Sequence, residues 1–111
     1  MKKRKITWDK TVLIYFSEAI RYIRKDSEQN ANKVKREILT RISELADYPE
    51  IHGPDKYKQY NNGNFLAFEL HRFRIAYMVK EEEIMIIRIR HTSLIADSPL
   101  LAFFKHNPFF L

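Results

Sequence analysis

Cysteine is absent from this chain, and glycine occurs only twice in its 111 residues. The lack of cysteine excludes disulfide bonds and thiolate metal sites, and it fits a reducing cytoplasm, where we expect the protein to act. Two glycines are too few for a glycine-rich phosphate loop. The four histidines, at positions 52, 71, 91 and 106, lack close metal-ligand spacing. We therefore expect no metal site and no cofactor.

Long apolar runs are also missing. No stretch approaches the roughly 20 apolar residues of a membrane span, and the N-terminus lacks the apolar core of a secretory signal. We therefore expect a soluble protein with no membrane attachment. Hydrophobic residues nevertheless make up 45% of the chain and aromatic residues 14%. That content is enough for a packed core, so we predict one folded domain spanning residues 1–111.

The charge balance is basic. Twenty Lys and Arg against fourteen Asp and Glu leave a net charge of +6 and an isoelectric point near 9.6. Such a balance favours a polyanionic partner. By net charge alone, RNA, DNA, an anionic membrane surface and an acidic protein would each suit as that partner.

The stretch Leu66–Ser93 predicts three antiparallel strands, because its apolar residues alternate with polar ones and two short polar breaks divide it. The alternation assigns three sets of side chains to a core: Leu66, Phe68 and Leu70; Phe73, Ile75, Tyr77 and Val79; and Met85, Ile87 and Ile89. Ile6–Trp8 suits a further short strand at the N-terminus. The sheet is therefore expected to be mainly antiparallel.

The opposite face of this predicted sheet carries Arg74, Arg88 and Arg90 with one carboxylate, Glu69. Two interpretations stay open. The arginines are solvated, with Arg74 paired to Glu69 across the strands, or they form a positive floor that binds phosphate groups.

Two helices are predicted between Asp9 and Pro49. Asp9 is suited to cap a first helix that runs to about Lys25, and Ser27 to cap a second. The first helix should bury Leu13, Phe16, Ile20 and Ile23, with Tyr15 off this stripe, and the second should bury Ala31, Val34, Ile38, Ile42 and Leu45. The break between them is short, so we expect an antiparallel hairpin packed on the sheet.

The segment Tyr48–Lys58 reads as a loop, in which His52, Lys56 and Lys58 are candidates for proton transfer or phosphate binding. Tyr57–Tyr60 is a candidate start of the sheet, and residues 61–64 predict a turn. The apolar tail 94–111 either packs on its own domain, which we favour, or joins two chains in a homodimer.

Three segments resemble the RelE/ParE superfamily of bacterial type II toxins. Phe73–Tyr77 is similar to its aromatic-Arg-aliphatic-x-Tyr strand, Arg88–Ser93 to its final strand, and Leu45–Pro49 to the end of its second helix. The resemblance implies an α+β toxin, with an N-terminal strand and a helical hairpin on a twisted sheet. It also implies that a cognate antitoxin neutralises the protein.

The superfamily divides by target. RelE-like members cut messenger RNA on the ribosome, whereas ParE-like members inhibit DNA gyrase. Metal-independent RNA cleavage needs a base, a cation at the phosphate and an acid. The resemblance assigns these roles to Arg74 as phosphate-stabilising cation and His91 as proton-transfer group. Glu69 is the only carboxylate on the predicted arginine face, so it is the candidate base or it orients an arginine. The cations expected to bind RNA are Lys56, Lys58, Arg72, Arg88 and Arg90.

One departure favours the other branch. Thr92 and Ser93 stand where many nuclease members have Arg, Lys or Tyr. Ribosome-dependent mRNA cleavage is our first hypothesis from the sequence. Gyrase inhibition, as in plasmid-stabilisation proteins, is the alternative. An RNA-binding module without catalysis is a third.

Overall fold

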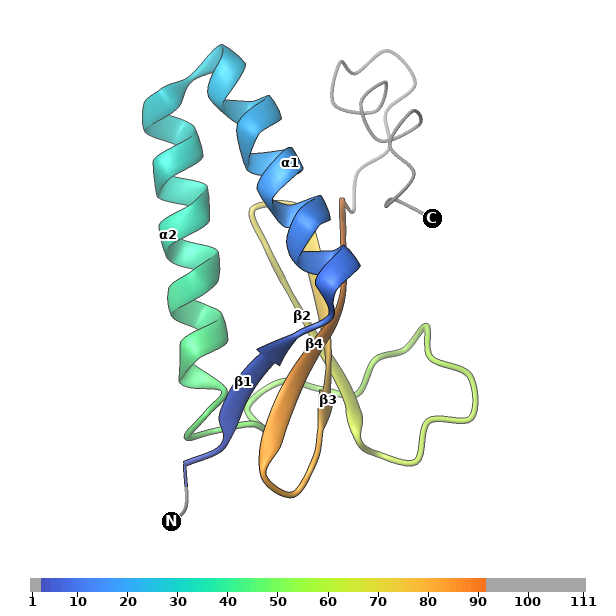
Figure 1. Ribbon diagram of the computed structural model, residues 1–111. Coiled ribbons are helices and arrows are strands. Elements are labelled where there is room, and N and C mark those ends of the chain that lie inside the picture. Colours follow the sequence, from blue (N-terminus) through green and yellow to red (C-terminus); the bar gives the residue numbers. More distant parts are fainter. Residues whose placement is uncertain (1–2, 92–111) are drawn as a thin grey trace.

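The computed structural model describes residues 3–91, in which two helices pack on one face of a four-stranded sheet (Figure 1). The elements follow in the order β1 (Lys5–Trp8), α1 (Lys10–Asp26), α2 (Glu28–Glu44), β2 (Phe65–Leu70), β3 (Phe73–Val79) and β4 (Glu83–His91). The strand order is β1-β4-β3-β2, with β1 parallel to β4 and the other neighbours antiparallel. The predicted α+β fold is confirmed, while the predicted tail 94–111 lies outside the described residues.

Both helices begin at the predicted caps. Asp9 Oδ1 accepts hydrogen bonds from the backbone N–H groups of Thr11 (2.9 Å) and Val12 (3.4 Å). Ser27 Oγ accepts one from Asn30 N–H at 3.0 Å. The extended backbone of Ser27 both ends α1 and begins α2. The chain therefore reverses at a single residue and forms the expected antiparallel hairpin. Neither helix in the described part is long and apolar enough to cross a membrane.

The buried stripe of α2 is the predicted one, but that of α1 is shifted. All five predicted core residues of α2 and its C-cap are at most 4% exposed. On α1, Leu13 is 46% exposed, whereas Tyr15, predicted to lie off the stripe, is 1% exposed. The core of α1 uses the spacing 12, 15, 16, 19 and 20, which turns Leu13 to the side of the helix. The prediction for Leu13 and Tyr15 was wrong.

Strand β4 contains a bulge that the alternation pattern did not predict. Tyr77 of β3 pairs with Ile86, while the preceding Ala76 pairs with Arg88, so Ile87 is an extra residue. An extra residue reverses which face the following side chains point to. Ile84 and Ile86 are therefore fully buried, in place of the predicted Met85 and Ile87. Beyond the bulge, Ile89 is 3% exposed, as predicted.

The β2–β3 connection is a two-residue turn of His71 and Arg72, with φ of 53° and 65°. Positive φ at both central residues matches the twist of a hairpin but strains side chains other than glycine. His71 Nε2 lies 2.8 Å from Glu37 Oε1 of α2, which fastens the turn to the helix layer. This hydrogen bond lowers the pKa of Glu37.

The predicted strand at Tyr57–Tyr60 does not form; those residues are turns and loop, and β2 begins at Phe65. The predicted turn at 61–64 is present, with Gly63 at φ 97° and its N–H donating to Asn61 Oδ1 at 2.9 Å. The side chain of Asn61 also donates to Phe65 C=O at 2.8 Å. Side-chain hydrogen bonds in the loop therefore stabilise the start of β2, the first strand of the meander.

Candidate functional site

The face of the sheet turned away from the helices, here called the open face, carries the predicted arginines. In the strand register Glu69 of β2 lies opposite Arg74 of β3, which in turn lies opposite Arg90 of β4. Arg88 lies opposite Ala76 on the same face and is exposed. Three cations and one carboxylate from three strands therefore share this surface.

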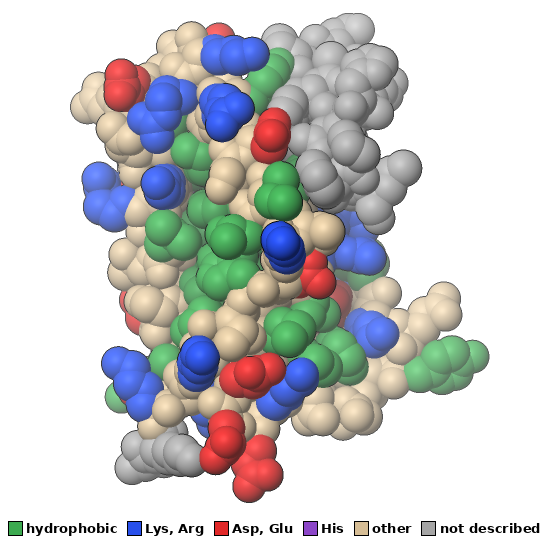
Figure 2. Space-filling view, in the orientation of Figure 1, with side chains coloured by type: hydrophobic (Ala, Val, Ile, Leu, Met, Phe, Trp, Pro, Cys, Tyr) green, Lys and Arg blue, Asp and Glu red, His purple; other side chains and the backbone are tan. Residues whose placement is uncertain are grey.

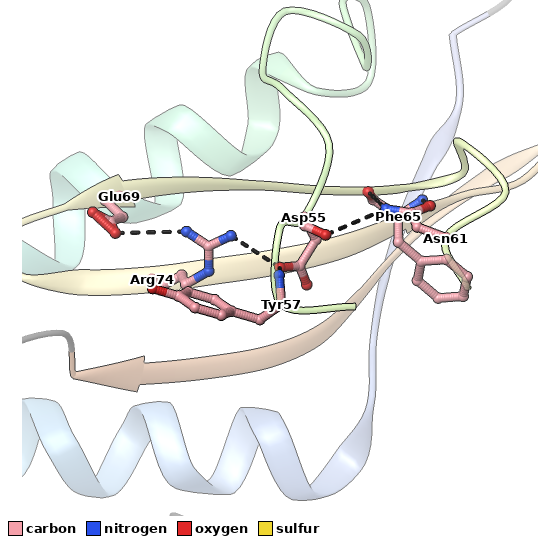
Figure 3. A network of polar contacts seen from close by, with 6 residues as sticks. All are labelled: Asp55, Tyr57, Asn61, Phe65, Glu69 and Arg74. Atoms are coloured by element: carbon pink, nitrogen blue, oxygen red, sulfur yellow. Dashed lines mark hydrogen bonds and ion pairs between the residues drawn. The ribbon is translucent and has the colours of Figure 1, made fainter. Parts of the chain in front are cut away.

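Arg74 is held by groups on both sides (Figure 3). One guanidinium nitrogen lies 2.9 Å from Asp55 Oδ1, and the other lies 3.5 Å from Glu69 Oε2. The ring of Tyr57 covers the guanidinium, with its centroid 4.7 Å away. The side chains of Arg74 and Asp55 are each 12% exposed. The charge of Arg74 is therefore neutralised and largely shielded from solvent.

Asp55 reaches the open face because the α2–β2 loop wraps around the edge of β2. On the helix side the hydroxyl of Tyr77 donates to Pro49 C=O at 2.7 Å. At the edge Ala67 N–H donates to Gly53 C=O at 3.1 Å, and Asp55 N–H donates to Phe65 C=O at 2.8 Å. These bonds extend the sheet by a short antiparallel bridge. The loop thus ends on the open face at Asp55, where it meets Arg74.

The two predicted lysines also lie on this side. Lys56 Nζ is 5.3 Å from the ring centroid of Tyr57, and Lys58 Nζ is 4.6 Å from that of Phe65. Both lysines are exposed. Together with Arg88 they supply positive charge that is accessible to a ligand, in contrast to Arg74.

His91 lies on the helix side of the sheet. It pairs with Phe73, a core residue that is 1% exposed, and the two rings meet edge to face at 5.5 Å. His91 itself is 7% exposed. Tyr15 of α1 interacts with the His91 backbone, and burial raises the pKa of the Tyr15 hydroxyl. The structure therefore does not bring His91 together with Arg74, because the sheet lies between them.

The other described histidines are also away from the open face. The ring of His52 stacks on core residue Phe68 at 4.6 Å, and its Nε2 is buried without a hydrogen-bond partner in the described part. Burial lowers the pKa of His52, and the nearby charge of Arg41 acts in the same direction. His71 is bound to Glu37 at the hairpin turn. None of the three imidazoles described can exchange a proton with a ligand beside Arg74.

Comparison with known families decides the class of this protein. A family model described as the ParE toxin of the type II toxin-antitoxin system, parDE, matches residues 6–95. The chain belongs to this ParE toxin family. It is therefore a toxin of a type II toxin–antitoxin system, and the family implies an antitoxin partner.

A solved structure supports the same fold for this ParE toxin. A chain described as "Chromosomal ParDE TA system from P. aeruginosa" superposes with a TM-score of 0.67 at 16% sequence identity. The alignment covers 84% of this toxin and all of that chain. A search of the curated proteins finds no match.

The site of the toxin can now be compared with the residues predicted from its sequence. The open face carries Glu69, Arg74, Arg88, Arg90, Lys56 and Lys58, whereas His91 lies on the other face and Arg72 at the β2–β3 turn. Among the residues that the structure describes, no group of three or more potential ligands is placed to hold a metal.

Sequence reasoning missed Asp55 and Tyr57, which hold Arg74 most closely. Both belong to the loop, and no periodic pattern relates them to β3. The available signal was Pro54-Asp55, a pair that favours a turn with a side-chain cap, and Asp55 Oδ1 does accept from Tyr57 N–H at 3.0 Å. That signal predicts the turn but gives no information about which face the carboxylate meets.

Proposed function

We propose that this toxin stops growth by binding a protein target, with DNA gyrase as that target, and that it does not cleave RNA. Its membership of the ParE family supports a ParE-like mechanism. The replacement of the nuclease branch's basic or tyrosine residues by Thr92 and Ser93 points the same way. Gyrase acts in the bacterial cytoplasm, so the proposal places the toxin there.

The observation that carries the proposal is the state of Arg74. To stabilise a phosphate, its guanidinium would have to leave Asp55 at 2.9 Å and emerge from beneath Tyr57. Two carboxylates beside it would also repel an incoming phosphate. These contacts favour a structural role, in which Arg74 fastens the α2–β2 loop to the sheet.

The position of His91 supports the same conclusion. General acid–base catalysis requires the catalytic group within hydrogen-bond reach of the proton it transfers, directly or through one water. His91 is buried against Phe73 on the helix side. An imidazole there cannot protonate a leaving group on the open face.

RNA cleavage is retained as a second candidate because of Lys56, Lys58 and Arg88. These three cations are exposed and gather on the open face. Exposed cations on one surface are what binding to a nucleic acid backbone requires. A mechanism of this kind would use lysines for charge stabilisation and would not use Arg74 or His91.

Controlled expression in a bacterial host separates the two candidates. Protein synthesis and DNA replication would be followed with separate radiolabelled precursors from the moment of induction. Gyrase inhibition predicts that replication stops first and that DNA breaks accumulate. If protein synthesis stops first, the proposed function is refuted and RNA cleavage takes its place.

A matched variant pair sharpens this experiment. Lys56→Ala with Lys58→Ala removes two exposed cations from the open face, and Lys33→Ala with Arg36→Ala removes two exposed cations from the solvent side of α2. Cleavage of RNA predicts loss of growth inhibition in the first variant only. Gyrase binding through another surface predicts that both variants remain toxic.

A further inference from the structure

Part of the α2–β2 loop, residues 55–64 and here called the arm, projects sideways from the edge of the sheet, away from both helices (Figure 1). In the space-filling view the arm extends from the lower right of the molecule, and an apolar side chain stands at its outer end (Figure 2). Among the large hydrophobic residues that the structure describes, Tyr60 of the arm is the most exposed, at 99%. Its ring therefore contributes almost nothing to the packing of its own domain.

The backbone of Tyr60 is strained. Its φ is 54°, in the left-handed region that glycine adopts freely but that costs energy for a bulky side chain. Within the described residues the side chain makes no hydrogen bond, ion pair or ring contact that would offset this strain. Strained residues of this kind cluster at functional sites. The conformation of Tyr60 therefore points to a contact with another molecule.

The chain directly after Tyr60 is fixed by the side chain of Asn61. Its amide nitrogen donates to Phe65 C=O at 2.8 Å, and its Oδ1 accepts from Gly63 N–H at 2.9 Å and from Phe65 N–H at 3.3 Å. These bonds close the end of the arm onto the start of β2. Tyr60 is thus held outward by the residue that follows it.

The chain before Tyr60 is fixed by Asp55. Its Oδ1 accepts from Tyr57 N–H at 3.0 Å, and its C=O accepts from Lys58 N–H at 3.2 Å. Its carboxylate is also paired with Arg74 at 2.9 Å. Hydrogen bonds therefore order the backbone on both sides of the exposed ring before a partner binds, which reduces the entropy lost on binding.

The surroundings of Tyr60 favour a protein partner over a single-stranded nucleic acid. A site for a single strand combines successive stacking rings with cations that follow the phosphate backbone. The other ring of the arm, Tyr57, already has Arg74 and Lys56 over it, at 4.7 and 5.3 Å. Within the described residues no cation lies over the ring of Tyr60. A single exposed tyrosine on an ordered backbone is instead the kind of side chain that fills a pocket at the centre of a protein interface.

We propose that Tyr60 is an anchor residue that inserts into an apolar pocket on DNA gyrase, with the arm as the target-binding element of the toxin. The inference rests on the proposed function and names the part of the toxin that makes the contact. In the complex the ring is buried, and its hydroxyl meets a polar group of the pocket. The ion pair of Arg74 and Asp55 fixes where the arm leaves the sheet. The charges of Lys56 and Lys58 take no part, so their removal leaves the anchor in place.

The first test measures binding of the full-length toxin to purified gyrase, without DNA, by biolayer interferometry. Tyr60→Ala should weaken binding about thirtyfold or more, the loss typical of an anchor residue. Tyr60→Phe keeps the ring and loses at most one hydrogen bond, so it should weaken binding by less than about tenfold. Tyr48→Ala is the matched control, because it removes another tyrosine of the same loop that is 64% exposed. It should bind like the unaltered toxin.

Three outcomes of this test would overturn the inference. Equal affinity of Tyr60→Ala and Tyr48→Ala would show that Tyr60 is not an anchor, while the proposed function would stand. Equal loss in Tyr60→Ala and Tyr60→Phe would show that the hydroxyl and not the ring makes the contact. No binding of the unaltered toxin would refute gyrase as the target, and the proposed function would fail with the inference. Thermal melts should show Tyr60→Ala to be as stable as the unaltered toxin, because the ring buries almost nothing.

The second test separates the protein partner from a nucleic acid. Affinity for a labelled single-stranded oligonucleotide of about 12 nucleotides, a length that covers one such binding site, is measured by fluorescence anisotropy. Tyr60→Ala and Tyr48→Ala should have the same affinity for it. If Tyr60→Ala loses oligonucleotide affinity and binds gyrase normally, the ring stacks on a base and the proposal is wrong. In a bacterial host Tyr60→Ala should no longer stop growth at equal expression, whereas Tyr60→Phe and Tyr48→Ala should. Full toxicity of Tyr60→Ala would also refute the anchor role.

Discussion

Replacing Asp55 with alanine should release the α2–β2 loop from the open face and lower the unfolding free energy by about 2 kcal/mol. A hydrogen bond to a charged group contributes roughly 1.5–3 kcal/mol, and the 2.9 Å contact with Arg74 joins side chains that are each only 12% exposed. Solvent therefore screens the pair little. Glu69 stays beside the guanidinium at 3.5 Å, which keeps the expected loss below the upper end of that range.

Glu69→Ala is the matched control, because it removes the other carboxylate of the same arginine. Glu69 is 51% exposed, so its loss should lower the unfolding free energy by less than about 1 kcal/mol. Urea unfolding can be followed through the single tryptophan, Trp8, whose ring lies 5.7 Å from that of Phe16 in the core. A double-mutant cycle with Arg74→Ala should give a coupling energy with Asp55 of about 1.5 kcal/mol.

A coupling energy near zero, or an Asp55→Ala variant as stable as Glu69→Ala, would show that Arg74 does not hold the loop. The argument against phosphate binding would then fail as well. Asp55→Asn tests that argument directly, because it removes the charge next to Arg74 while keeping an oxygen for Tyr57 N–H. Its affinity for single-stranded RNA should rise more than that of Asp47→Asn, an exposed aspartate outside the site; an equal rise would show that Asp55 is not what keeps phosphate from Arg74.

Three further predictions concern the loop and the hairpin turn. Burial lowers the pKa of His52, so below about pH 6.5 the unfolded chain binds the proton first. The unfolding free energy should therefore decrease as the pH is lowered below that value. His52→Phe keeps the stack on Phe68 and should remove this part of the decrease, as measured by urea titrations at several pH values. Arg72→Gly should raise the unfolding free energy by about 0.5–1 kcal/mol, because glycine adopts the φ of 65° without strain; a loss of stability in thermal melts would contradict this. Tyr77→Phe removes the 2.7 Å bond to Pro49 C=O and should lower the unfolding free energy by about 1.5 kcal/mol, whereas an unchanged urea midpoint would show that water replaces the bond.

Features that depend on neighbouring residues were predictable from the sequence. The caps at Asp9 and Ser27 and the stripe of α2 each follow from side chains within a few residues of one another. The antiparallel pairing of β2, β3 and β4 was also predictable from the sequence, because the connections between them are short. Leu13 and Tyr15 were exchanged on α1 because both fit an apolar stripe by spacing alone. Which of the two is buried is decided by the position of β4 beneath α1, and the residues of β4 lie more than 60 positions later in the chain than Tyr15.

The path of the α2–β2 loop could not be predicted, and the site depends on it. The loop residues that contact Arg74 are Asp55, which pairs with its charge, and Tyr57, whose ring covers it; they lie 19 and 17 positions before it (74 − 55 and 74 − 57). The pair of Arg74 with Glu69 was one of the two interpretations that the sequence left open, and the strand register does place these residues opposite each other. Given only that pair, a half-exposed glutamate leaves the arginine available to a ligand. The added contact with Asp55 is what supports our proposal that Arg74 has a structural role and does not bind phosphate.

The bulge at Ile87 explains how one strand satisfies two conflicting alternations. Ile84 and Ile86 are buried at even positions, and an unbroken strand would then also bury Arg88 and Arg90 at a large desolvation cost. The extra residue reverses the phase, so both arginines reach the open face and the odd positions Ile89 and His91 enter the core. Two adjacent isoleucines at 86 and 87 are the sequence signal for this change of phase. The same bulge that turns Arg88 and Arg90 to the open face thus places His91 on the helix side of the sheet, which supports our proposal that the basic face and His91 do not form one catalytic centre.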